Sequence, residues 1–260
     1  GTEAVPAAGY VITAQGTSVN TITIQGNGAA NSIITGGSGV STTTFFDAFF
    51  ALRGADWVTI QGFAMTQSAS TTVLEREIGV ALLHASVTNG AQNNTIQNNT
   101  ITLNKTNLNT WGIYSNNNHS ATTAWATTES VTNNTTGPAS GNKVYNNIIT
   151  NVNMGIAFIG TATTANQDIG NDIGGSAAGT GNTITNWGGA AAANSPISNS
   201  GTSYCIYLNH QVGENVSFNS LTSATISGTA VTLRGIYKDY STGASIVGTT
   251  NINSNTITIT

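Results

Sequence analysis

Carboxylates are the side chains in this sequence best suited to catalysis or metal binding, and they are few. Charged residues make up only 6% of the 260 positions. The densest cluster is Glu75-Arg76-Glu77. Asp168 and Asp172 lie close together in NQDIGNDIGG, where carboxylate oxygens beside glycine turns would suit Ca²⁺. Paired acids or Ca²⁺-binding acids on one face are also what the cleavage of a polysaccharide requires.

Each of these acidic groups also has a simpler interpretation. The spacing within 168–172 matches neither an EF-hand nor the Asp-bearing nonapeptide repeat, so a turn is the alternative. The 75–77 cluster fits a solvated loop whose charges pair locally. Asp56 and Glu214 both precede an apolar repeat residue, but they lie far apart in the chain. We therefore expect no catalytic acid pair.

The other reactive side chains give no sharper signal. His84, His119 and His210 show no metal-ligand spacing, and no HExxH, GxSxG or P-loop string occurs. The one cysteine, Cys205, lies in the apolar run YCIYL and is predicted to be a small buried apolar side chain. The sequence predicts no catalytic residue, no cofactor and no metal site. Six scattered Lys and Arg residues and a net charge of −4 disfavour nucleic acid as a partner, and no apolar run would span a membrane.

A nine-residue repeat organises the chain. NTIQNNTIT at 94–102 returns at 58–66, 142–150, 214–222 and 250–258. Its third and eighth residues are apolar, and two sites five apart have opposite parity, so a turn must separate two short strands. With looser copies included, the third position is predicted to point inward at Ile24, Ile60, Ile96, Val144, Ile184, Val216 and Ile252. Asn tolerates the turn conformation and is expected to form a structural ladder at Asn27, Asn99, Asn147, Asn219 and Asn255.

A second strand type alternates with the repeat. It occurs as GVALL at 79–83, GIYS at 112–115, GIAFI at 155–159, CIYL at 205–208 and GIYK at 235–238. The loops between the two strand types vary in length, which a solenoid tolerates because each coil contacts only its neighbours. A β-sandwich, the alternative, would show more regular spacing and tight hairpin turns. Tyr114, Tyr207 and Tyr237 are expected to face outward, either stacking between coils or offering a platform for a sugar.

These segments resemble the parallel β-helix repeat proteins of the pectate-lyase type, and particularly secreted surface proteins of Bacteroidota-like bacteria. The resemblance lies in ALRGADWVTIQGF at 51–63, NNTIQNNTIT at 93–102 and NDIGGSAAGTGNTITN at 171–186. It implies three parallel sheets with Asn ladders at the bends. It also implies carbohydrate chemistry in some members and adhesion or structure in others, and the fold alone does not choose between these.

The fold class predicted is all-β, a right-handed parallel β-helix of about seven coils that forms a single domain over 1–260. Neither GTEAVPAAGYVITAQG at the start nor INSNTITIT at the end resembles a cap, so we expect continuation in a longer chain or stacking on a neighbouring subunit. The function expected is an extracellular or cell-surface structural or adhesive solenoid that stacks end to end into a filament. The alternative is a carbohydrate-active enzyme, a lyase or a hydrolase, or a glycan-binding module.

Overall fold

Three stacks of short parallel strands form the molecule. The computed structural model describes residues 1–37, 48–67, 76–105, 110–120, 137–161, 163–188, 202–225, 232–239 and 248–260, without the side chains of 118–120. Glu75 lies outside the described residues, and so does the side chain of His119.

Each of the three sheets takes one strand from every coil. Sheet A contains β1 (Thr2–Ala4), β4 (Ile33–Thr35), β7 (Ala64–Thr66), β10 (Thr100–Thr102), β13 (Ile148–Thr150), β17 (Thr183–Trp187), β21 (Ser220–Ser223) and β24 (Thr256–Thr258). Sheet B contains β2 (Tyr10–Ile12), β5 (Ala48–Arg53), β8 (Ile78–His84), β11 (Trp111–Ser120), β14 (Met154–Ile159), β18 (Thr202–Asn209) and β22 (Thr232–Asp239). Sheet C contains β3 (Ile22–Gln25), β6 (Val58–Gln61), β9 (Thr95–Gln97), β12 (Lys143–Tyr145), β16 (Asp172–Ile173), β20 (Asn215–Ser217) and β23 (Asn251–Asn253).

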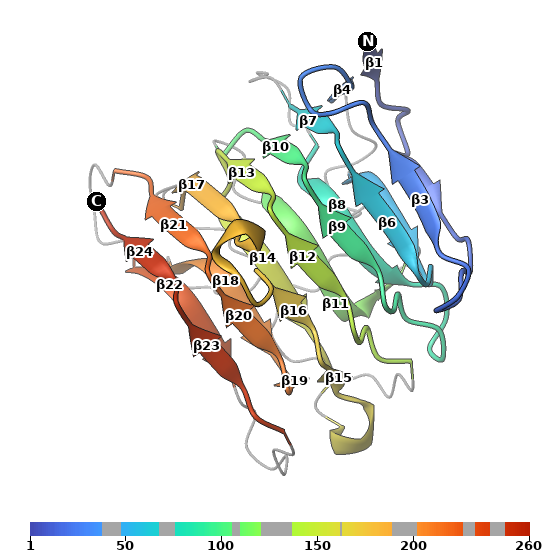
Figure 1. Ribbon diagram of the computed structural model, residues 1–260, viewed down its shortest axis with the longest axis vertical. Helices are drawn as coiled ribbons and strands as arrows, with labels where there is room; N and C mark the ends of the chain where they lie inside the picture. The colour runs from blue at the N-terminus through green and yellow to red at the C-terminus, as the bar shows by residue number, and fades with distance from the viewer. Residues whose placement is uncertain are drawn as a thin grey trace.

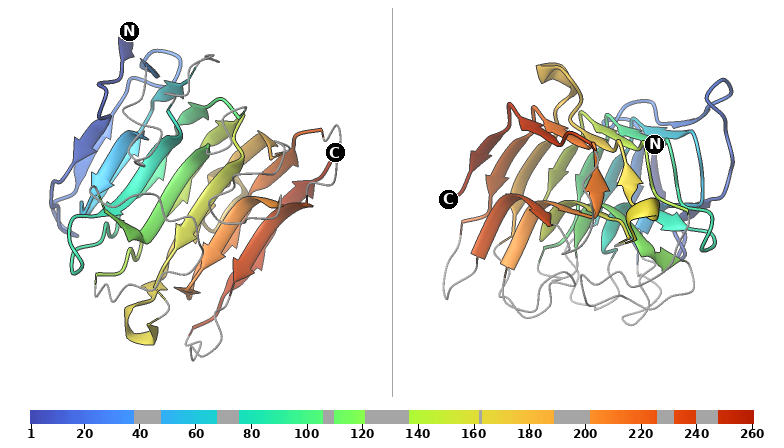
Figure 2. Two further views of the ribbon diagram at one scale, coloured as in Figure 1. Left: turned by 180° about the vertical axis from the view of Figure 1, so that it is seen from behind. Right: turned by 90° about the horizontal axis from the view of Figure 1, so that it is seen from below.

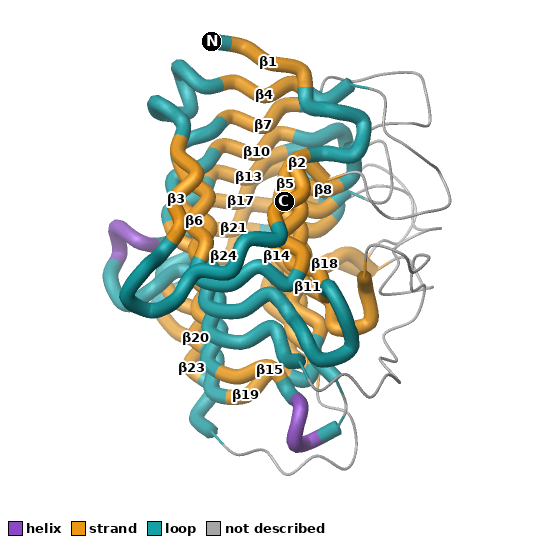
Figure 3. Tube along the Cα trace, turned by 90° about the vertical axis from the view of Figure 1, so that its right-hand side faces the viewer, coloured by secondary structure: helices purple, strands orange, loops and turns teal. Residues whose placement is uncertain are grey.

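The chain visits sheets B, C and A in turn and then begins the next coil. All pairings between the named strands of these sheets are parallel, and the order of strands in each sheet follows the order of the coils. The fold is therefore a right-handed parallel β-helix with seven strands in sheet B and seven in sheet C. The coils lie side by side from the N-terminal to the C-terminal end (Figures 1 and 2), and sheet A forms one continuous column (Figure 3).

The remaining regular elements decorate this stack. β15 (Asp168–Ile169) and β19 (Gln211–Val212) form a small two-stranded sheet. Two short 3₁₀ helices, η1 (Thr164–Asn166) and η2 (Ala178–Thr180), lie in the connections of the fifth coil. No helix in the described part of the chain is long and apolar enough to cross a membrane.

Columns of apolar side chains fill the interior of the stack. The inward residues of successive strands pair directly, as Ile60 does with Ile96 in sheet C and Ile101 with Ile149 in sheet A. Most are fully buried, so each coil covers the apolar face of the one before it. A steric constraint requires glycine at the start of the sheet-B motif. A Cβ on Gly112 would lie 2.6 Å from the Gly155 carbonyl oxygen.

The predicted bend lies between sheets C and A. Asn98 and Asn146 occupy it with φ of 56° and 49°, the left-handed conformation that Asn tolerates better than most residues. The fifth coil departs from the predicted register. Ile173, in β16, pairs with Val144 and Val216, whereas Ile184 is an inward residue of sheet A, paired with Ile149 and Leu221.

The physical reason for the shifted register is an insertion inside the repeat. Residues 174–181, which include η2, lie between β16 and β17 at the bend that every coil except the first and the fifth crosses in two residues. Ile184 therefore occupies the eighth position of the repeat rather than the third. It remains fully buried, so the insertion changes the bend and leaves the core intact.

Candidate functional site

A column of buried asparagines joins the coils at the bend between sheets C and A. The amide of Asn147 donates to the Ile96 carbonyl (2.9 Å) and to Asn182 Oδ1 (3.0 Å). Its Oδ1 accepts from the backbone N–H of Asn99 (3.1 Å) and from the Asn99 amide (3.2 Å). The Asn147 side chain thus satisfies backbone groups of the preceding coil, and its own backbone N–H donates to Asn182 Oδ1 of the next coil (3.0 Å), which makes the column structural.

The structure places the predicted ladder residues as follows. Asn99, Asn147, Asn219 and Asn255 all lie in this column, with Asn182 between Asn147 and Asn219. Asn27 lies outside the column. It is exposed, and its backbone N–H donates to Ser32 Oγ (2.8 Å), because an extra turn at 27–31 lengthens the bend of the first coil.

Sequence reasoning missed a second polar column, at the bend between sheets B and C. Asn94, Asn142 and Asn171 are buried and linked through their side chains to neighbouring coils. The signal was present in the sequence, since each of the three directly precedes a sheet-C strand. In the next two coils this position is held by Glu214 and Thr250.

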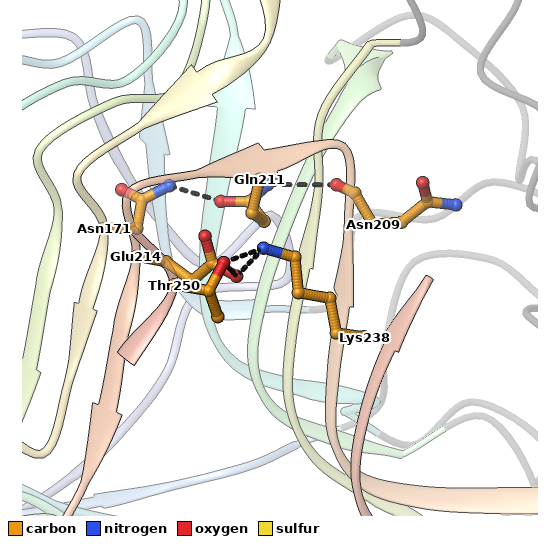
Figure 4. A network of polar contacts seen from close by, with 6 residues as sticks. All are labelled: Asn171, Asn209, Gln211, Glu214, Lys238 and Thr250. Carbon is orange, nitrogen blue, oxygen red and sulfur yellow. Dashed lines mark hydrogen bonds and ion pairs between the residues drawn. The ribbon is translucent and has the colours of Figure 1, made fainter. Parts of the chain in front are cut away.

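At this step of the column an ion pair replaces the amides (Figure 4). Lys238 forms a salt bridge with Glu214 Oε1 and donates a hydrogen bond to Thr250 Oγ1, which donates to the same carboxylate oxygen (3.2 Å). The side chains of Glu214 and Lys238 are 1% and 6% exposed. Removing one partner of a buried ion pair costs more stability than the intact pair contributes. The contact therefore ties the last coil to the one before it rather than offering a reactive acid.

The C-terminal end of the stack exposes its apolar interior. Ile252 and Ile257 continue the inward columns of sheets C and A, yet they are 44% and 45% exposed. Ile259, just beyond β24, is 49% exposed. Strands β22, β23 and β24 each pair on one side only, so the three sheets end level in this coil with unpaired edges.

The N-terminal end is hollow. A cavity of about 430 Å³ opens there between the first two coils, with Ile24, Ile34, Phe50 and Phe63 among its lining residues. Tyr10 stacks on Phe50 at a ring-centroid distance of 5.3 Å.

The acidic residues do not form a shared site in the described residues. Asp172 Oδ2 accepts from the Tyr145 hydroxyl (2.5 Å) on the outer face of sheet C. Asp168 is buried in the two-stranded β15–β19 sheet, and its carboxylate accepts hydrogen bonds from the amides of Asn117 and Gln211. Asp56 accepts from the Gln92 backbone at another coil. Among the described residues no group of three His, Cys, Asp or Glu side chains is arranged to hold a metal ion.

Arg76 and Glu77 differ from the solvated loop predicted for them, because both are buried. The Arg76 guanidinium reaches across the coils to donate to the carbonyls of Ala48 and Pro6. The Glu77 carbonyl accepts from the Trp111 backbone (2.7 Å). These contacts give the pair a role in joining coils.

Asp168 is the most strongly perturbed acid. Burial raises the pKa of its carboxyl to about 6, although hydrogen bonds from Gln211, Asn117 and the Ala139 backbone act in the opposite direction. Burial has the opposite effect on the imidazole of His84 and lowers its pKa, because it disfavours the charged form. Both side chains are enclosed, Asp168 fully and His84 to within 3% exposure, so we assign them to the interior of the stack.

The outward tyrosines lie on the outer face of sheet B but do not form an open platform. Tyr114 and Tyr207 are 2% and 0% exposed and belong to an apolar cluster separate from the core. Tyr237 is half-buried in β22, the last strand of sheet B, and its ring stacks on that of Tyr207 at a centroid distance of 5.8 Å. Of the two interpretations left open by the sequence, stacking between coils describes Tyr207 and Tyr237.

Comparisons with known proteins add little. No protein-family model matches the chain. No curated protein matches it either. Among solved structures, an alginate lyase from Paenibacillus sp. str. FPU-7 is similar over 98% of this chain and 89% of that one, with a TM-score of 0.32 and 14% sequence identity. A likeness this distant carries no argument about function, so the class of the protein rests on its own topology, that of a parallel β-helix.

Proposed function

We propose that this chain is an extracellular structural or adhesive β-solenoid that associates end to end. The observation that carries the proposal is the uninterrupted stacking of coils through buried asparagine columns, with Ile252 and Ile257 of the C-terminal coil still exposed. Throughout the rest of the stack, equivalent side chains are covered by the next coil. An exposed apolar patch rimmed by unpaired strand edges is typical of a surface that binds another protein.

The polar groups of the described residues support a structural role. The asparagine columns form hydrogen bonds between neighbouring coils, and Glu214 and Lys238 form an ion pair between the last two. Complementary surfaces at opposite ends of one molecule make a heterologous contact that does not close, which produces a linear stack. The location outside the cell rests on the resemblance of the repeats to secreted surface proteins.

Self-association of the full chain tests this function. We expect the sedimentation coefficient to rise with protein concentration in analytical ultracentrifugation, because a heterologous contact that does not close can be repeated from copy to copy. A single monomeric species over the whole accessible concentration range would refute end-to-end association.

A second candidate function, glycan binding or cleavage, is favoured by one cluster on the outer face of sheet C. Lys143 is exposed and its Cα pairs with that of Asp172 on the neighbouring strand. Tyr145 donates to Asp172, and the Asn215 amide donates to the other carboxylate oxygen (2.7 Å). Burial, followed by the bond to Asp172, raises the pKa of the Tyr145 hydroxyl. The exposed Lys143 ammonium lies beside the Tyr145 phenol and the Asn215 amide, which hold the Asp172 carboxylate across three coils, and it would suit a carboxylate of an extended acidic polysaccharide.

The second candidate predicts retention on an immobilised acidic polysaccharide that falls in Lys143→Ala. Lys105→Ala is the matched control, since Lys105 donates to Asn186 at another bend. Affinity electrophoresis measures retention, and absorbance of unsaturated products reports cleavage. Wild-type protein that is neither retained nor active removes this candidate and leaves the structural proposal standing.

A further inference from the structure

The outer face of sheet A carries two parallel rows of side chains. Each strand from β4 to β24 turns its central apolar residue inward, so the residues on either side of it point outward. The strands pair in register and stack in one column (Figure 3). The first row is Ile33, Ala64, Thr100, Ile148, Thr183, Ser220 and Thr256, and the second row is Thr35, Thr66, Thr102, Thr150, Thr185, Thr222 and Thr258.

Threonine dominates this face and fills the second row completely. Ten of the fourteen side chains in the two rows are threonine, none is charged, and all are exposed or half-buried. A threonine side chain is stiff because it branches at Cβ, and it presents a methyl group beside a hydroxyl that both donates and accepts. Neighbouring hydroxyls of the second row are close enough to bond, as Thr185 does to Thr150 (3.2 Å).

The outer faces of the other two sheets have a different chemistry. Sheet C presents Lys143 and Asp172, which are paired residues of neighbouring strands. Sheet B presents the exposed Arg234, whose guanidinium lies over the Tyr237 ring at 4.5 Å from its centroid. Charged and aromatic side chains of this kind suit a protein or a charged polymer. The two rows of sheet A contain neither, so their ligand should be uncharged and rich in hydrogen-bonding groups.

The fold fixes the spacing of the two rows. Strands of neighbouring coils lie about 4.8 Å apart, and alternate residues of one strand lie about 6.7 Å apart. The asparagine column at the bend before sheet A holds the coils in register, as Asn147 does with Asn99 and Asn182. The six intervals from β4 to β24 therefore give a regular array of hydroxyl and methyl groups about 29 Å long.

We propose that the outer face of sheet A binds ice. The surface of an ice crystal is uncharged, and each of its water molecules donates and accepts hydrogen bonds, as the threonine hydroxyls do. Water molecules on a prism face of hexagonal ice repeat in two directions at distances close to the two spacings of this array. A stiff array loses little conformational entropy when it meets a rigid lattice, so many weak contacts can form together.

Other ligands fit this face less well. A protein partner or an acidic polysaccharide would find no charge in the two rows with which to pair. A crystalline neutral polysaccharide also presents ordered hydroxyl groups and is the nearest competitor. Sugar rings are usually held by aromatic side chains, however, and the two rows have none. Ice matches both the charge and the regularity of the face.

Ice-affinity purification tests the proposal with the full chain. Ice that grows slowly in a dilute protein solution excludes ordinary solutes and retains proteins that adsorb to it. We expect the wild type to be enriched in the ice fraction and to slow the recrystallisation of ice in a frozen film. In Thr102→Tyr/Thr150→Tyr, two bulky rings stand above the second row at adjacent coils, and we expect both effects to be lost.

The matched control is Thr59→Tyr/Thr95→Tyr, which alters two half-buried threonines paired in the same way on the outer face of sheet C. We expect this variant to behave like the wild type, and circular dichroism checks that both variants fold. Exclusion of the wild type from ice would overturn the proposal, and so would equal enrichment, or equal loss, in the two variants. Retention on crystalline cellulose without enrichment in ice would assign the face to a neutral glycan instead. End-to-end association is tested separately by sedimentation, so either proposal can fail alone.

Discussion

Alanine in place of Asn147 is expected to lower the free energy of unfolding by roughly 3–5 kcal/mol, because several buried groups lose their partners at once. The side chain is 1% exposed and accepts two hydrogen bonds from Asn99. Its own amide donates to Ile96 and Asn182. Alanine leaves the Asn99 N–H and the Ile96 carbonyl in a dry interior. Urea unfolding followed by circular dichroism measures the loss.

The neighbouring asparagine is the matched control for this prediction. Asn146 is exposed, has a φ of 49°, and donates one hydrogen bond to Asn98 (2.7 Å). Glycine accepts that backbone conformation, so Asn146→Gly is expected to change stability by less than about 1 kcal/mol. Equal effects of the two substitutions would show that the buried column does not hold the coils together.

The second large effect concerns association. Ile257→Glu is expected to abolish the concentration-dependent rise in sedimentation coefficient, because the contact between two copies would bury an unpaired carboxylate. Ile257 lies at the end of sheet A with 45% of its surface exposed. Its own coil is already at the edge of the stack, so the fold itself should tolerate the change.

Ile148→Glu separates this effect from a general change in surface charge. Ile148 belongs to another three-residue strand of sheet A and is 50% exposed, but it lies in the middle of the stack. We expect this variant to associate like the wild type. If both glutamates block association, or if neither does, the contact does not involve the C-terminal coil.

Much of the fold follows from short-range pattern. Two apolar positions five residues apart required two short strands with a turn between them, and the structure has these strands in β9 and β10. Ile184 was assigned to the wrong strand of its repeat because the insertion at 174–181 falls inside the pattern. The shorter string NDIGG, at β16, carried the missing strand.

The contacts at the ends could not be predicted in this way. The bonds between Glu3 and Tyr10 and between Glu214 and Lys238 join residues of different sheets or coils, and no local spacing specifies them. The burial of Tyr114 and Tyr207 likewise depends on packing outside the repeat. Local sequence predicts how coils stack, whereas what occurs at the last coil depends on contacts across the molecule.

Electron microscopy of the concentrated wild-type protein tests end-to-end association most directly. Seven coils at about 4.8 Å each give a rise of about 34 Å per copy. The account predicts particles of constant width whose lengths increase in steps of that size. Particles of a single length, or assemblies that broaden sideways through the sheet faces, would contradict it.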